Sequence, residues 1–227
     1  MSAAAQPPTE LTHRARELAL AAALVSYPDP EFGELLALAA HPVATALAAV
    51  IATPAGVADL QVRHGELFDR GGPRASLYET EYGRMRGMGK GHTLADLAGF
   101  YHAFGLTLDE SRHELLDHLA VELEFYVVLL LKQAALTARA DADGVEVVAS
   151  ARAKFLAEHL AGLAGAVAAR PEVGADPVYG PVFAWCAALI QRECEVLQVT
   201  AAPLDFFPTE DDRAPMKCGA VQLPVVP

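Results

Sequence analysis

The sequence predicts an all-α protein built as a single helical domain, with a long central helix and an irregular, proline-containing C-terminal tail. Apolar residues recur at three- and four-residue spacing along almost the whole chain, which is the period of an amphipathic helix. Alternating stretches rich in Val, Ile and Thr, which would indicate strands, are nearly absent. With 53% hydrophobic residues among 227, the chain can bury a sizeable core and is not typical of a disordered protein.

Capping residues and prolines divide the N-terminal part into several helices. Thr9 is placed to cap a first helix that ends near Ser26. Asp29 followed by Pro30 is typical of the start of a second helix, because proline is favoured in the first helical turn. Two further helices are expected after the later prolines, Pro42 and Pro54.

Residues 87–92, with the sequence Gly-Met-Gly-Lys-Gly-His, are predicted to form a flexible turn between two helices. A phosphate-binding loop is the alternative for such a glycine-rich segment. That alternative requires a Ser or Thr directly after the lysine and a preceding strand, and the sequence offers neither. Thr93 is expected to cap the helix that follows, and Gly105 is expected to end it.

The pattern from residue 109 to about 139 predicts one long central helix. A helical segment over residues 145–170 and a last helix ending near Leu197 follow it. Pro203 and four later prolines disfavour any helix beyond that point. We therefore expect a disordered N-terminus at residues 1–8, a helical domain at residues 9–202 and an extended tail at residues 203–227.

Charge and hydropathy exclude several kinds of partner. The 17 Lys and Arg against 29 Asp and Glu give a net charge of −12, which disfavours nucleic acid or an anionic membrane surface. The apolar stretches are far shorter than the roughly 20 residues that cross a bilayer. The first residues lack the features of a secretory signal, so we expect a cytoplasmic protein. Cys186 and Cys194 lie on one predicted helix, about 12 Å apart, which is too far for a disulfide.

The start of the predicted central helix is strongly acidic. Residues 109–124 hold six acidic side chains and one arginine, a net charge of −5. This density suits the positive end of a helix dipole, and it would equally receive an arginine-rich peptide. Composition leaves both interpretations open. His113 and His118 diverge by about 140° around a helix, so they do not hold one metal ion from the same face.

Four segments carry a family resemblance by their order: residues 66–68 (Glu-Leu-Phe), 77–82 (Leu-Tyr-Glu-Thr-Glu-Tyr), 94–106 (Leu-Ala-Asp-Leu-Ala-Gly-Phe-Tyr-His-Ala-Phe-Gly-Leu) and 114–125 (Glu-Leu-Leu-Asp-His-Leu-Ala-Val-Glu-Leu-Glu-Phe). Together they resemble the TorD/DmsD/NarJ family of molybdoenzyme maturation chaperones, along about residues 10–200. Glu114, Asp117 and His118 match the family's Glu-Pro-x-Asp-His pattern, with Leu115 in place of the proline. The resemblance extends to the branch that serves enzymes of the dimethyl-sulfide, ethylbenzene, selenate and chlorate type.

This resemblance implies a cytoplasmic, all-helical chaperone without catalytic residues, metal or cofactor of its own. Its partner would be the apo form of a molybdenum-containing catalytic subunit, bound through its N-terminal peptide. The chaperone would assist insertion of the molybdenum cofactor and hold back export until loading is complete. In the family, the loop before the Tyr-Glu-Ser/Thr motif and the Asp-His pair are implicated in holding the peptide, and this resemblance nominates Tyr78, Glu79, Tyr82, Asp117 and His118.

The acidic residues of the same region extend this predicted peptide site. Glu114, Asp117 and Glu122 are expected to receive cationic groups of the peptide, since carboxylates accept paired hydrogen bonds from guanidinium groups. The two tyrosines are expected to hold the apolar part of the peptide. His118 is expected to orient the charged groups.

Two other classes of function remain open from the sequence. A metal-dependent helical hydrolase would take its ligands from several helices, and the candidates are His64, His92, His102 and His118. A regulatory helical module would instead enclose a small molecule in an apolar pocket.

Overall fold

The computed structural model describes residues 6–29, 31–39, 41–52, 56–69, 75–83, 86–107 (the backbone alone at 86–88) and 115–204. The regular structure in these segments is helical, and the one β-type pairing among them is an isolated bridge. The prediction of an all-α fold is confirmed. Of the helices in these segments, none is long and apolar enough to cross a membrane. The expected tail lies outside the described residues beyond position 204.

The helices follow one another closely along the chain. The N-terminal part holds α1 (Pro8–Val25), α2 (Phe32–Leu38), α3 (Pro42–Ile51), α4 (Val57–His64), the π-helical turn η1 (Gly65–Asp69) and the 3-10 turn η2 (Glu79–Glu81). The remainder holds α5 (Arg86–Ala103), α6 (Leu119–Ala138), α7 (Ala142–Phe155), the π-helical turn η3 (Leu156–Leu160), α8 (Ala161–Ala168), α9 (Pro171–Gly174) and α10 (Tyr179–Leu197).

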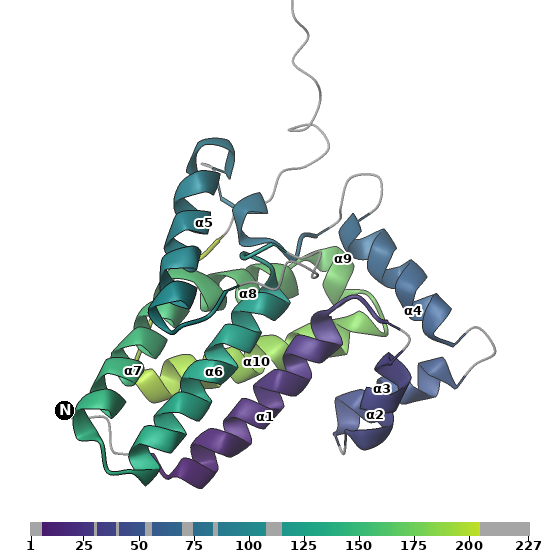
Figure 1. The fold of residues 1–227 in the computed structure, drawn as a ribbon. Helices are drawn as coiled ribbons and strands as arrows, with labels where there is room; N and C mark the ends of the chain where they lie inside the picture. Colours follow the sequence, from purple (N-terminus) through teal and green to yellow (C-terminus); the bar gives the residue numbers. More distant parts are fainter. Residues whose placement is uncertain are drawn as a thin grey trace, which may run out of the picture.

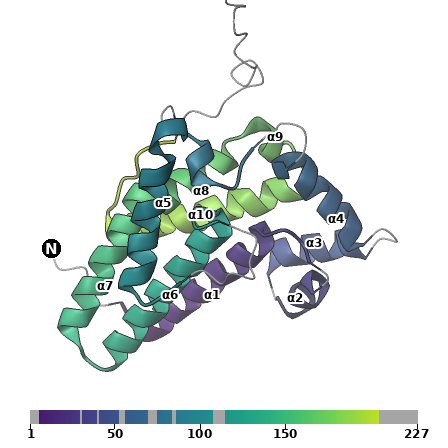
Figure 2. The same ribbon diagram turned by 45° about the horizontal axis from the view of Figure 1, so that its top comes forward.

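Helices α1, α6 and α10 form the centre of the fold. α1 packs along α6, and α10 passes behind them while contacting α1 and α8 (Figure 1). α7, η3 and α8 form one continuous helical segment that packs on α6 and α10. Figure 2 shows α2, α3 and α4 grouped on one side of this bundle and α5 on the opposite side.

A buried ion cluster ties four of these helices together. Glu193 of α10 accepts hydrogen bonds from Arg14 of α1 and from Arg152 of α7, the latter at 2.7 Å. The Tyr126 hydroxyl of α6 donates to Glu193 at 3.0 Å and accepts from Arg152 Nε at 3.2 Å. Burial favours the neutral acid, yet the hydrogen bond and positive charge of Arg14, together with the charge of Arg152, lower the pKa of Glu193. The Glu193 carboxylate therefore offsets part of the positive charge of the two buried guanidinium groups.

Several predicted helix boundaries are confirmed. The first predicted helix corresponds to α1, which ends at Val25, one residue before the predicted end. The predicted cap is wrong, because Pro7 is the N-cap residue and Thr9 already lies in the first helical turn. Gly105 ends α5 as predicted, with a φ of 76°. The N–H groups of Gly105 and Leu106 bond back to the carbonyls of His102 and Tyr101, each at 2.9 Å, which satisfies the last turn of the helix. The two cysteines of α10 are free and buried.

The predicted turn at residues 87–92 is wrong, because α5 begins at Arg86 and continues through this segment. Each of its three glycines costs about 1 kcal/mol of helix propensity relative to alanine. Once the downstream turns have formed, however, each further residue adds a hydrogen bond without a new nucleation step. Lys90 also pairs with Glu81 of η2, Nζ to Oε1 at 3.2 Å, which ties this end of α5 to the rest of the fold.

The predicted helix over residues 109–139 is wrong at its start. α6 begins only at Leu119, and His118 before it has an extended backbone with φ −79° and ψ 133°. The Leu119 N–H donates to the Leu77 carbonyl at 2.8 Å. The backbone on either side of His118 thus pairs with a distant segment, and it is not available for the helical hydrogen bonds that local periodicity predicted.

Candidate functional site

Two of the sequence motifs meet at an isolated antiparallel β-bridge between Tyr78 and His118. Next to the bridge, the Glu79 N–H donates to the Asp117 carbonyl at 2.9 Å. The rings of Tyr78 and His118 meet edge to face, with their centroids 5.0 Å apart. Four of the predicted site residues, which lie on two segments far apart in the sequence, are therefore neighbours in the fold.

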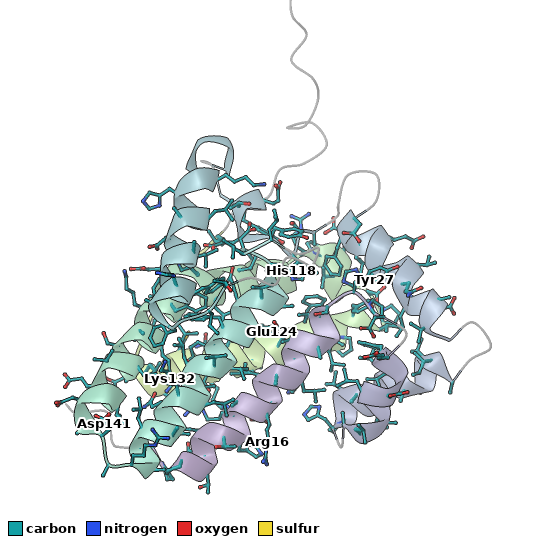
Figure 3. All side chains as sticks on the ribbon, in the orientation of Figure 1. Arg16, Tyr27, His118, Glu124, Lys132 and Asp141 are labelled. Atoms are coloured by element: carbon teal, nitrogen blue, oxygen red, sulfur yellow. The ribbon has the colours of Figure 1, made fainter. Side chains whose placement is uncertain are left out.

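A cavity of about 210 Å³ lies beside this bridge. Its walls are formed by Tyr27, His64, Phe68, Asp69, Leu77, Tyr78 and His118. Figure 3 shows His118 at the start of α6 and Tyr27 just after α1, at the same end of these two helices. Tyr27 is 47% exposed and the Asp69 side chain 57% exposed. The cavity therefore has aromatic walls and a carboxylate at its rim.

His64 forms the inner wall of the cavity. Its buried ring lies 5.4 Å from the ring of Tyr27 and 4.9 Å from that of Phe68, measured between centroids. Nε2 lies 3.4 Å from the Val25 carbonyl. Nδ1 has no hydrogen-bond partner among the described residues and lies 3.9 Å from the Asp69 carboxylate. The π-helical turn η1 starts directly after His64 and carries Phe68 and Asp69, in keeping with the frequent use of π-turns at functional sites.

Asp117 holds the loop that carries Tyr78. Its side chain is fully buried, and Oδ2 accepts hydrogen bonds from the Thr80 N–H at 3.1 Å and from the Thr80 hydroxyl at 2.6 Å. Oδ1 has no hydrogen-bond partner in the described part of the chain. The carboxylate thus fixes η2 against the start of α6, and it does not line the cavity.

Glu79 begins a chain of polar side chains that leads away from the cavity. Its Oε2 lies 2.9 Å from His159 Nδ1, and His159 Nε2 lies 3.1 Å from Asp96 Oδ2. Burial opposes a charge on the imidazole, but the hydrogen bonds and charges of these two carboxylates outweigh it and raise the pKa of His159. His159 therefore connects η2 to α5 through η3.

Glu122 lies in the interior behind the bridge. Its side chain is fully buried, and neither carboxyl oxygen has a hydrogen-bond partner among the described residues. Burial, and then the negative charges of Glu79 and Asp117, raise the pKa of Glu122 well above its ordinary value. The group is thus favoured as a neutral acid.

Tyr82 closes the loop of residues 76–82, which carries Tyr78, by bonding back to Ser76. Its hydroxyl donates to the Ser76 carbonyl at 2.7 Å and accepts from the Ser76 N–H at 3.2 Å. Burial raises the pKa of Tyr82 to about 12, so the phenol keeps its proton and both hydrogen bonds. Tyr82 thereby positions Tyr78 without lining the cavity.

The predicted site residues thus divide by position. Tyr78 and His118 line the cavity, whereas Glu79, Asp117, Glu122 and Tyr82 lie behind it. Glu114 lies outside the described residues. Sequence reasoning missed four cavity residues, Tyr27, Phe68, Asp69 and Leu77. The Glu-Leu-Phe motif at residues 66–68 was a usable signal for two of them, because it ends at Phe68 and Asp69 follows it.

The four histidines considered for a metal-dependent hydrolase do not converge. His64 and His118 line the cavity, but His92 and His102 are exposed on α5. Among the described residues, the side chains placed to share one metal ion are Asp96, Glu158 and His159.

A second hollow, of about 710 Å³, lies between α5, α6 and α7. Its lining is largely apolar and includes Phe100, Phe104 and Leu136, with Lys132 and Lys154 above two of the rings. This hollow is open to solvent, unlike the closed apolar pocket expected of a small-ligand module.

Comparison with known proteins identifies relatives of the chain. The family described as nitrate reductase delta subunit matches residues 30–169. A perchlorate reductase assembly chaperone protein of Dechloromonas aromatica (strain RCB) is 38% identical over 90 residues, which are 39% of this chain and 38% of that protein. A chlorate reductase assembly chaperone protein of Ideonella dechloratans is 36% identical over 104 residues, which are 45% of this chain and 52% of that protein. The matches span about half or less of these relatives.

The range matched by the family includes both segments that form the Tyr78–His118 bridge, together with η1 and η3. It covers more than half of the chain. The resemblance seen in the ordered motifs is thereby confirmed. The chain belongs to the nitrate reductase delta subunit family, and with it to the TorD/DmsD/NarJ-type maturation chaperones.

Proposed function

We propose that this protein is an assembly chaperone that binds the N-terminal region of an immature molybdenum-containing oxidoreductase subunit, without making or breaking covalent bonds. Family membership and the description of two relatives as reductase assembly chaperones support this proposal. The structural observation that carries it is the cavity beside the bridge between Tyr78 and His118. This cavity is the binding site for the peptide.

The chemistry of the cavity suits a segment with apolar and cationic side chains. The rings of Tyr27, Phe68 and Tyr78 offer apolar surface, and their faces attract a cation. Asp69 adds a carboxylate at the rim. The net charge of −12 attracts a basic segment over a longer range, so its association should slow as salt is added.

The buried acids would act on this site indirectly. Asp117 holds Thr80, and Glu79 bonds His159, so both keep the Tyr78 loop in place. Glu122 has no exposed surface. We therefore assign the direct contacts to Tyr78 and His118 and a positioning role to the acids.

Retention of the N-terminal region accounts for assisted cofactor insertion and for the delay of export. A subunit held by its leading segment stays competent to receive the molybdenum cofactor. An export signal within that segment is covered until loading is complete. Loading before export places the chaperone in the cytoplasm, and none of these steps requires a cofactor on the chaperone.

The proposal is tested by capture followed by a peptide titration. The affinity-tagged full chain is expected to isolate the large subunit of a molybdenum enzyme, identified by mass, in its metal-free form. A synthetic peptide of that subunit's N-terminal segment is then titrated calorimetrically. Tyr78→Ala and His118→Ala should each weaken binding about tenfold or more, as expected for central aromatic contacts.

His102→Ala is the matched control, because His102 is an exposed histidine on α5 away from the cavity. It should bind the peptide as tightly as the wild-type protein. If His118→Ala keeps native helicity and unchanged affinity, the cavity is not the binding site. If the full chain captures no molybdenum-enzyme subunit, the chaperone role itself is contradicted.

A further inference from the structure

Three side chains of metal-ligating type converge outside the cavity. Asp96 comes from α5, and Glu158 and His159 come from η3. One ligand atom from each of them lies within 4.8 Å of the others. Asp96 Oδ2 and His159 Nε2 are 3.1 Å apart. No local motif indicated this group, because Asp96 is far from the other two residues along the chain.

The spacing fits a shared ion. Oxygen and nitrogen ligands lie about 2.0–2.2 Å from Zn²⁺, so two ligands of a tetrahedral ion are about 3.3 Å apart. The 3.1 Å between Asp96 Oδ2 and His159 Nε2 is close to that value. The 4.8 Å limit leaves Glu158 within reach through rotation of its exposed side chain.

The carboxylate of Glu79 fixes the orientation of the His159 ring through the nitrogen that does not face Asp96. Nδ1 lies 2.9 Å from Glu79 Oε2, and both side chains are buried. Nδ1 donates its proton to Glu79, and Nε2 becomes a metal ligand when it gives up the proton of its contact with Asp96, so binding of an ion should release a proton. Histidines that bind metals almost always use this arrangement, in which a carboxylate sets the tautomer and direction of the ring.

The surroundings leave an ion an open path. The side chains of Asp96 and Glu158 are 39% and 44% exposed, whereas that of His159 is 4% exposed. Water can therefore complete the coordination on the outer side. Lys154 Nζ lies 3.5 Å from Glu158 and would have to release it, which an exposed lysine does at little cost. The π-turn that presents Glu158 and His159 is itself a feature common at functional sites.

We propose that Asp96, Glu158 and His159 form a binding site for a divalent transition-metal ion, with Zn²⁺ as the best match to one imidazole and two carboxylates. The ion would fasten α5, which stands at the edge of the bundle in Figure 1, to η3. Its role is structural. Through Glu79 it would also steady the loop that carries Tyr78.

The test uses the full chain after removal of metal with a chelator. Zn²⁺ alone is titrated in competition with a chromophoric chelator, and one ion per chain is expected to bind with micromolar or tighter affinity. Asp96→Asn and Glu158→Gln should each weaken binding at least tenfold. At a hundredfold excess over the dissociation constant, Zn²⁺ should raise the melting temperature of the wild-type protein by roughly 5–10 °C. Mg²⁺, which binds imidazole ligands poorly, should leave the melting temperature unchanged.

Glu146→Gln provides the matched control, because Glu146 is an exposed acid on the neighbouring helix α7. It should bind Zn²⁺ as the wild-type protein does. Equal affinity in Asp96→Asn and in the wild type would show that surface histidines hold the ion, and the proposal would fail. It would fail equally if no stoichiometric binding were seen. Neither result bears on the peptide cavity, which is tested separately.

Discussion

The ring of Tyr78 meets the imidazole of His118 edge to face, with 5.0 Å between centroids, beside a backbone bridge that joins the same two residues. The groups that hold this pair in place are buried behind it. Asp117 accepts two hydrogen bonds from Thr80, and Tyr82 closes the loop on Ser76. The position of the Tyr78–His118 pair therefore depends on hydrogen bonds made by side chains that do not line the cavity.

Thr80→Val removes the hydroxyl that donates to Asp117 at 2.6 Å and keeps the shape of the side chain. We expect the free energy of unfolding to fall by about 1–3 kcal/mol, because a buried carboxylate loses a hydrogen bond. Urea denaturation measures the change. Thr137→Val is the control, since its hydroxyl only bonds back to Gln133 of the same helix. A cost no larger than that of the control would contradict the positioning role of Asp117.

Glu193→Gln removes the negative charge between Arg14 and Arg152. The two guanidinium groups would remain buried without a counter-charge, and we expect a loss of about 3–5 kcal/mol in the free energy of unfolding. Glu195→Gln on the same helix changes an exposed acid and should cost less than about 0.5 kcal/mol. Chemical denaturation of the two variants side by side measures the difference, and equal costs would rule out a central role for the cluster.

The lowered pKa of Glu193 makes this contribution depend on pH. The unfolded state takes up a proton near the ordinary value of 4.5, and the folded state only at lower pH. The stabilisation is therefore complete above 4.5 and is lost as the pH falls through the folded-state pKa. Unfolding curves from pH 7 downward should show wild type and Glu193→Gln converging. A gap that stays constant in acid would contradict the assignment.

The contribution of Glu122 to stability should depend on pH in the opposite direction. Its pKa is raised by burial and by the charges of Glu79 and Asp117, so the folded state binds a proton that the unfolded state releases near 4.5. Stability falls as the pH rises above that value. Glu122→Gln stays neutral at every pH, and its stability relative to the wild type should increase between pH 4 and pH 7. Thermal unfolding at both pH values measures this, and a relative stability independent of pH would show that Glu122 is ionised in the fold.

Gly105→Ala tests the end of α5. The φ of 76° is costly for a residue with a side chain, while a Cβ at this position meets no atom within 4 Å. We therefore expect a loss of about 1 kcal/mol that comes from the backbone alone. Gly99→Ala lies within the same helix with equally open space, and it should stabilise by about 0.5–1 kcal/mol. The two melting temperatures should shift in opposite directions, and a shift in the same direction would contradict this reading of the C-cap.

The sequence was most informative where structure is local. The period of apolar residues predicted α1 and α10, and Gly105 predicted the end of α5 through its tolerance of positive φ. Local rules failed at residues 87–92, where three glycines did not prevent a helix. They also failed just before Leu119, because His118 pairs with a residue that no local pattern connects to it.

The motifs in the chain were sufficient to indicate the family and to nominate Tyr78 and His118, since a motif records residue identity and order. Which nominated residues reach a cavity was decided only by the tertiary structure. Burial of Asp117 and Glu122, the place of Tyr27 in the cavity wall and the approach of Asp96 to His159 all come from packing between segments distant in the chain. Hydropathy and spacing describe neighbours along a helix, whereas a cavity is formed by side chains that meet only when the helices pack.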